Sequence, residues 1–108
     1  MNNIQLDRVL TAVADPTRRA ILDRLARGPA RVTEVAAPFA MSLNAVSKHV
    51  KVLESAGMVK RARNGREHTL TLNPAPLREV AAWVHRYSRF WNERLDRLET
   101  YFAKEKKK

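Results

Sequence analysis

Apolar residues recur every three or four positions through much of the chain, which is the spacing of a helix with one buried face. In the first half, this pattern predicts helices over residues 4–14, from Pro16 to a stop at Gly28-Pro29, over 32–37 and over 43–56. Asp15 and Ser42 are suitable N-caps for the second and fourth of these helices. In the fourth helix, Val46, Val50 and Leu53 are predicted to face the core, which leaves the opposite face polar.

After Gly57 the helical spacing gives way to short runs that are typical of strands. Residues 58–63 and 67–72 flank the tripeptide Asn64-Gly65-Arg66. Because Asn-Gly readily adopts the positive φ angles of a type I′ turn, these runs predict a β-hairpin. Arg63 and Arg66 would lie at its tip.

The last part of the pattern, residues 77–102, predicts a long helix whose apolar spacing is close to a heptad repeat. Its apolar positions are Leu77, Val80, Val84, Tyr87, Trp91, Leu95, Leu98 and Phe102, and Trp83 and Phe90 widen the stripe. A domain of this size cannot bury so long a stripe, so much of it is expected to contact a second copy of the chain. A pocket for a hydrophobic ligand is the alternative interpretation of the same residues.

In order, the predicted elements are mainly α with a β-hairpin wing, α-α-α-α-β-β-α, which is the order of a winged helix-turn-helix. No linker or internal repeat is visible, so residues 1–103 are predicted to form one domain. The lysine-rich residues 104–108 are predicted to be a disordered tail.

The formal net charge is +10, from 21 lysines and arginines and 11 aspartates and glutamates. Such a charge attracts nucleic acid, although it could also serve only solubility. Its distribution favours a binding surface, because residues 42–76 hold six basic and two acidic residues, whereas residues 77–103 hold five and four.

The sequence contains no cysteine, which excludes disulfides and thiolate metal sites. Neither a signal peptide nor an apolar run of membrane-spanning length is visible, so a soluble cytoplasmic protein is expected. There is no glycine-rich phosphate loop and no carboxylate pair with a histidine at catalytic spacing. We therefore expect neither enzyme activity nor a cofactor.

The polar face of helix 43–56 has the properties needed to read DNA. An α-helix fits the major groove, and short side chains near its N-terminus reach base edges. The polar side chains on this face are Asn44, Ser47, Lys48 and Lys51. The hydroxyl of Ser42 could both cap the helix and bind a phosphate, and the hairpin arginines could reach the flanking backbone or minor groove.

Residues 15–22, DPTRRAIL, and residues 41–59, MSLNAVSKHVKVLESAGMV, resemble the ArsR family of bacterial transcriptional regulators. Residues 90–98, FWNERLDRL, resemble the last helix of a metal-independent branch of that family. The resemblance covers nearly the whole chain. It implies a homodimeric repressor that reads an inverted repeat in double-stranded DNA and thereby occludes RNA polymerase.

The same resemblance implies roles for individual residues. It places Leu43, Asn44, Ser47 and Lys48 nearest the bases, and Lys51 near a phosphate. Family dimerisation through the first and last helices implies an interface that includes Leu6, Leu10, Trp83, Tyr87, Trp91, Leu95 and Leu98. The sequence departs from the family at Ala40, where glycine is common, and at Asn44, where this branch often has proline; Asn44 could change the base that is read.

Many family members hold metal ions through cysteine pairs in the helix that matches residues 32–37, or through histidine and aspartate sets in the last helix. Here residues 32–35 contain no thiol and the last helix contains only His85, so no metal site is expected. His49 is expected to form a hydrogen bond within the fold. Arg18 and Arg19 could either approach phosphates or simply solvate the second helix.

The alternative function is a winged-helix module that contacts protein or RNA without a specific operator. The aromatic residues lie mostly on the last helix, away from the basic surface, so they offer no platform for stacking bases. This disfavours the RNA interpretation. The sequence identifies neither an operator nor a small-molecule inducer.

Overall fold

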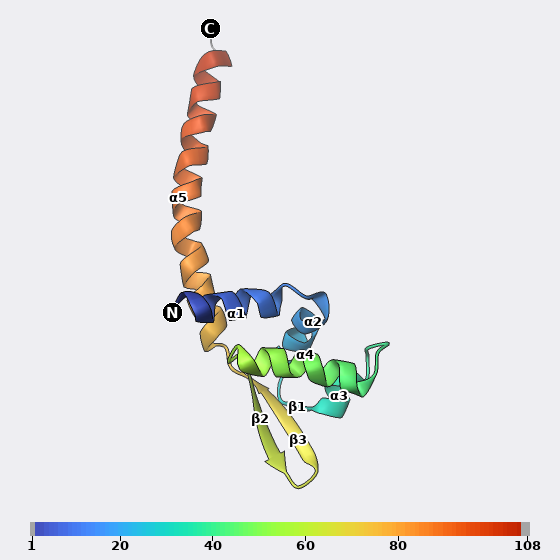
Figure 1. The fold of residues 1–108 in the computed structure, drawn as a ribbon. Coiled ribbons are helices and arrows are strands. Elements are labelled where there is room, and N and C mark those ends of the chain that lie inside the picture. The colour runs from blue at the N-terminus through green and yellow to red at the C-terminus, as the bar shows by residue number, and fades with distance from the viewer. Residues whose placement is uncertain (1, 107–108) are drawn as a thin grey trace. The chain divides into compact units, whose positions relative to one another are not determined.

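The computed structural model describes residues 2–106, which form a winged helix-turn-helix followed by a long helix (Figure 1). The elements are α1 (Asn3–Val13), α2 (Pro16–Ala26), β1 (Ala30–Arg31), α3 (Val32–Ala36), α4 (Leu43–Ser55), β2 (Val59–Asn64), β3 (Glu67–Leu72) and α5 (Ala75–Lys106). The chain divides into two compact units at residue 78, so α1 to β3 belong to the first unit and most of α5 to the second. The predicted fold class is confirmed, with β1 as an additional strand.

The helix starts follow the predicted caps. The Asp15 carboxylate accepts a hydrogen bond of 3.0 Å from the backbone N–H of Arg18, and Pro16 occupies the first turn of α2. The Ser42 hydroxyl accepts one of 3.1 Å from the backbone N–H of Ala45. Each cap satisfies a backbone donor that has no partner inside the helix.

The core of the first unit lies between the inward faces of α1, α2, α3 and α4 and the sheet. Predicted core residues Val46, Val50 and Leu53 are fully buried, and Ile21 of α2 is buried as well. The remaining buried side chains are Val9, Ala12, Leu22, Leu25, Ala30, Val35, Ala56, Met58, Val59, Leu70 and Pro76. Burial of this apolar surface holds α4 against the rest of the unit and leaves its other face to solvent.

The sheet has three antiparallel strands in the order β1-β3-β2. The strand that sequence analysis missed, β1, pairs Ala30 with Leu70 and Arg31 with Thr69. A strand of two residues has no alternation that a sequence pattern could reveal. It is formed because β3 presents a free edge to the segment between α2 and α3.

The hairpin is confirmed, but its turn differs from the predicted type. Asn64 pairs with Glu67, so the two-residue loop is Gly65-Arg66 and not Asn64-Gly65. Gly65 has φ +64°, and no residue other than glycine has a positive φ within residues 2–106. A positive φ at the first loop position alone is the pattern of a type II′ turn, not of type I′.

The long helix α5 begins two residues before the predicted start at Leu77 and extends beyond Phe102 to Lys106. It therefore includes Lys104–Lys106 of the tail predicted to be disordered, whereas Lys107 and Lys108 lie outside the described residues. Within the second unit, the apolar stripe is open to solvent: Trp91 is 56% exposed, and Tyr87, Leu95 and Leu98 are exposed to a similar extent. Thus the helix has an apolar face that nothing in its own unit covers.

Candidate DNA-binding surface

The outward face of α4 carries the side chains that the sequence assigned to DNA. Leu43, Asn44, Lys48 and Lys51 are exposed, and Ser47 is partly buried. Leu43 is notable because an apolar side chain that is 50% exposed at the start of a helix contributes little to the core. Such a side chain can contact the methyl group of a thymine instead.

The start of α4 combines a cap with an exposed hydroxyl. Ser42 is exposed, and its Oγ accepts the hydrogen bond from Ala45 described above. The hydroxyl proton is free to be donated outward, and the partial positive charge of the helix N-terminus favours an anion nearby. The capping role of Ser42 is confirmed, and its phosphate contact stays a prediction.

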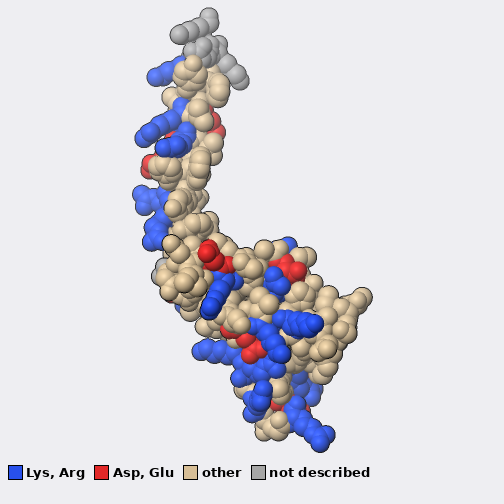
Figure 2. All heavy atoms as spheres, in the orientation of Figure 1, with Lys and Arg blue, Asp and Glu red and all other residues tan. Residues whose placement is uncertain are grey.

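The hairpin projects cationic side chains beyond the sheet. Arg63 and Arg66 are both exposed, and within residues 2–106 no carboxylate lies within 4 Å of either guanidinium group. Figure 2 shows lysine and arginine side chains gathered over the region that holds α4 and the hairpin. Their charge is therefore available to a phosphate.

A cleft of about 360 Å³ joins α4 to the hairpin. It brings together three of the predicted DNA-binding residues, Leu43, Ser47 and Arg66, with Thr33 of α3 and His68 of β3. The helix face and the hairpin are thus two sides of one concave surface in the first unit. This arrangement would let α4 and the wing contact adjacent parts of one duplex.

Arg61 has a different role from the other basic residues of segment 42–76. Its Nη2 donates to Glu54 Oε1 of α4 at 2.7 Å, and its Nη1 lies 2.8 Å from His68 Nδ1 of β3. Its side chain is only 18% exposed, and its Nε has no hydrogen-bond partner in the described structure. Arg61 therefore fastens the hairpin to α4, and its side chain also lines the cleft between them.

Arg18 and Arg19 make contacts that the sequence did not predict, and whether either approaches a phosphate stays a prediction. Both bind backbone carbonyls at the carboxyl end of α1: Arg18 Nε donates to Ala12 at 2.7 Å, and Arg19 Nη1 donates to Val13 at 2.7 Å. Arginine is well suited to this place because the last carbonyls of a helix have no partner within it and carry a partial negative charge.

His49 forms the hydrogen bond within the fold that the sequence predicted. Its Nδ1 lies 3.2 Å from Nη1 of Arg18 and 3.8 Å from Oδ2 of Asp15. The hydrogen bond from the Arg18 backbone lowers the pKa of Asp15 and outweighs the opposite effect of desolvation, and the charge of the Arg18 side chain also lowers this pKa. Asp15 is thus held as a carboxylate at the start of α2.

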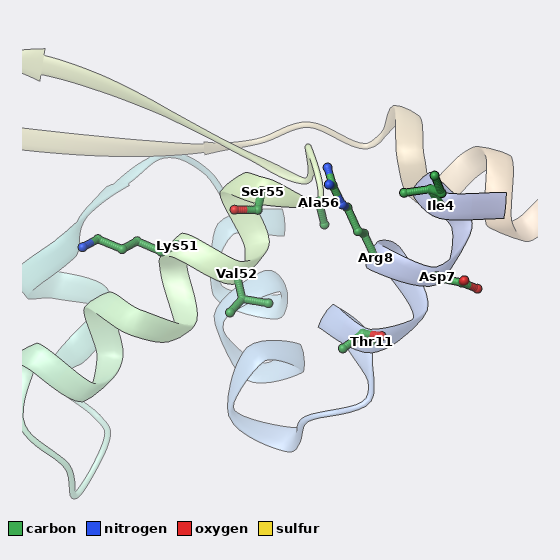
Figure 3. A pocket seen from close by; sticks show the side chains of 8 residues that line it. All are labelled: Ile4, Asp7, Arg8, Thr11, Lys51, Val52, Ser55 and Ala56. Carbon is green, nitrogen blue, oxygen red and sulfur yellow. The ribbon is translucent and has the colours of Figure 1, made fainter. Parts of the chain in front are cut away.

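A second hollow, of about 620 Å³, lies between α1 and the last turns of α4 (Figure 3). Ile4, Arg8 and Thr11 of α1 line one side, and Val52 and Ser55 of α4 line the other. Here the two helices do not close on each other. Their contact is tighter toward the carboxyl end of α1, where Val9 and Ala12 are buried and Arg18 bridges to His49.

This chain is similar to known proteins in both sequence and fold. A family model described as a helix-turn-helix domain matches residues 13–62. The HTH-type transcriptional regulator Rv2034 of Mycobacterium tuberculosis is 43% identical over 82% of this chain and 80% of its own length. A crystal structure of an ArsR-family transcriptional regulator has a TM-score of 0.81 and 40% identity, and the match covers 85% of this chain and 95% of that one. This chain belongs to the ArsR family of transcriptional regulators.

A solved structure of a possible ArsR-family regulator is described as a homodimer. The homodimeric winged helix-turn-helix DNA-binding domain of Mb0332 from Mycobacterium bovis has a TM-score of 0.63 and 29% identity, and covers 79% of each chain. The part of our ArsR-family regulator that matches the helix-turn-helix model runs from the end of α1 into β2. It includes every predicted DNA-binding residue of α4 and ends just before Arg63.

The histidines of this ArsR-family regulator are not gathered into one site. His49 lies beside Arg18 and His68 beside Arg61, and His85 lies on α5. Among residues 2–106, no three histidine or acidic side chains are placed to hold one metal ion. None of the helices in that range is long and apolar enough to cross a bilayer.

Proposed function

We propose that this ArsR-family regulator is a homodimeric, cytoplasmic repressor that reads an inverted repeat in DNA with α4 and the hairpin. The observation that carries the proposal is the concave surface of the first unit. On it, Leu43 and Ser47 of α4 face Arg66 of the hairpin across one cleft, and Lys48 and Lys51 extend the positive charge along the helix. None of these side chains is among the buried residues of the core, so the surface is available to bind DNA.

The geometry of α4 supports binding in the major groove. The N-terminal turn carries short or apolar side chains that can approach base edges, and the following turns carry lysines that can neutralise phosphates. The hairpin arginines reach beyond the sheet toward the flanking backbone or minor groove. In this assignment Asn44 and Ser47 specify the sequence, whereas Lys51, Arg63 and Arg66 position the protein.

The exposed stripe of α5 supports a dimer. Apolar side chains spaced as in a coiled coil, each about half exposed in a single chain, are covered efficiently by a second copy of the same helix. On α1, Leu10 is exposed and Leu6 is partly buried, so both are available to a contact between subunits. A two-fold axis would place the two copies of α4 about one turn of DNA apart, and binding would then block RNA polymerase.

The experiment is selection of bound sequences from random duplex DNA, followed by footprinting on the selected site and measurement of affinity at several salt concentrations. We expect an inverted repeat, protection of two half-sites, and a log–log salt slope of roughly −4 to −8 from several phosphate contacts per dimer. A duplex with one half-site scrambled is the matched control. Equal affinity for selected and random DNA would instead favour a winged-helix module that binds protein or RNA.

A further inference from the structure

One guanidinium group joins α1 to the DNA-reading helix. Arg18 Nε donates to the carbonyl of Ala12 at 2.7 Å, and Nη2 donates to the carbonyl of Thr11 at 3.0 Å. The third nitrogen, Nη1, lies 3.2 Å from Nδ1 of His49, which belongs to α4. Arg18 itself lies in the first turn of α2, so the three helices meet at this side chain.

The chemistry of these groups defines the direction of the bond. A guanidinium carries only donors, so Nδ1 of His49 must accept, and the imidazole is the neutral tautomer with its proton on Nε2. Asp15 Oδ2, the acidic group beside this nitrogen, lies at 3.8 Å, beyond hydrogen-bond distance, and is engaged by the backbone N–H of Arg18. Because the guanidinium is planar and its donors are fixed, the contact constrains both distance and orientation.

The remaining contacts between α1 and α4 are less directional. Val9, Ala12 and Val50 are buried by apolar packing, which opposes separation but tolerates small rotations. At the other end of α1 the helices are separated by the open hollow between Ile4 and Ser55 (Figure 3). The hydrogen bond from Arg18 to His49 therefore adds a directional constraint on the angle between α4 and α1 to the packing of α4 against its neighbours.

We propose that Arg18 is a positioning residue that sets the separation of the two DNA-reading helices in the dimer, and hence the half-site spacing that the protein accepts. This inference rests on the proposed function, in which α1 contributes to the subunit interface. If α1 is held at that interface, a rotation of α4 relative to α1 also moves α4 relative to the α4 of the partner subunit. One base pair of extra spacing shifts a half-site by about 3.4 Å along the DNA and turns it by about 35°.

The chain offers a matched control for this role. Arg19 also donates to a carbonyl at the end of α1, but it has no hydrogen bond to α4. Affinities of wild type, Arg18→Ala and Arg19→Ala would be measured by fluorescence anisotropy on the selected operator and on versions with one base pair added or removed between the half-sites. We expect wild type and Arg19→Ala to bind the altered spacings at least about tenfold more weakly, and Arg18→Ala to lose most of that difference.

A second pair of variants keeps the test valid if Arg18→Ala folds poorly. His49→Asn retains an acceptor near the position of Nδ1, whereas His49→Phe retains bulk without one. The loss of affinity on altered spacings should persist in His49→Asn and become smaller in His49→Phe. A purely structural role of His49 would instead lower the stability of both variants. An unchanged penalty in folded His49→Phe or Arg18→Ala would overturn the inference. Absence of sequence-specific binding by the wild type would overturn the proposed function instead.

Discussion

Removal of Glu54 should destabilise the first unit because it leaves the partly buried guanidinium of Arg61 without its carboxylate partner. Arg61 is 18% exposed and Glu54 29% exposed, and their side chains meet at 2.7 Å. Loss of one partner from a fully buried pair costs about 3–5 kcal/mol, whereas exposed pairs contribute about 1 kcal/mol or less. This pair lies between the two limits, so Glu54→Ala should lower the free energy of unfolding by about 2 kcal/mol.

The double variant Glu54→Ala/Arg61→Met separates this explanation from simple loss of packing. Methionine keeps an apolar stem but removes the charge, and it also removes the Arg61 Nε that has no partner in the described structure. The double variant should therefore recover most of the stability and come within about 1 kcal/mol of wild type. The hydrogen bond to His68 would be lost in it, which accounts for an incomplete recovery.

Urea unfolding followed by circular dichroism, at several protein concentrations, would measure these free energies, because dimerisation makes stability depend on concentration. Glu67→Ala is the control, since Glu67 pairs with Arg31 on the surface, where both side chains are more than half exposed. It should cost less than about 1 kcal/mol. A double variant as unstable as Glu54→Ala would refute the reasoning.

Three further predictions address the DNA surface, the dimer and the cap of α2. Ser47→Ala combined with Lys48→Ala should abolish the distinction between selected and random DNA in footprinting while sedimentation still reports a dimer; intact discrimination would contradict the assignment of α4. Trp91→Glu should yield monomers in analytical ultracentrifugation, because an unpaired charge in an apolar interface costs several kcal/mol, whereas Ala82→Glu on the opposite face of α5 should remain dimeric. The pKa of Asp15 is lowered in the folded protein, so its charge stabilises the fold above about pH 4 and this contribution is lost as the pH falls through the lowered pKa. The difference in the free energy of unfolding between wild type and Asp15→Asn should be smaller at pH 3 than at pH 6. An equal difference at both pH values would contradict a role for the charge of Asp15.

Much of the fold could be predicted because its determinants are local. The caps at Asp15 and Ser42 act over three residues, and the inward positions Val46, Val50 and Leu53 repeat with the period of a helix. The polar face of α4 follows from the same period, which is why the candidate DNA-binding residues could be named before their positions were known. The apolar stripe of α5 was equally visible in its spacing.

Other features depend on contacts between distant parts of the chain. The short strand β1 exists only because β3 offers it an edge, and the hairpin loop falls at Gly65-Arg66 because cross-strand pairing extends to Asn64. A charge count treats every arginine alike. In the structure, however, Arg18 forms a hydrogen bond with a side chain 31 positions away, and Arg61 forms hydrogen bonds with Glu54 and His68. Periodicity reports which face of an element is apolar, but the partner of a buried polar group is known only after packing brings the two together.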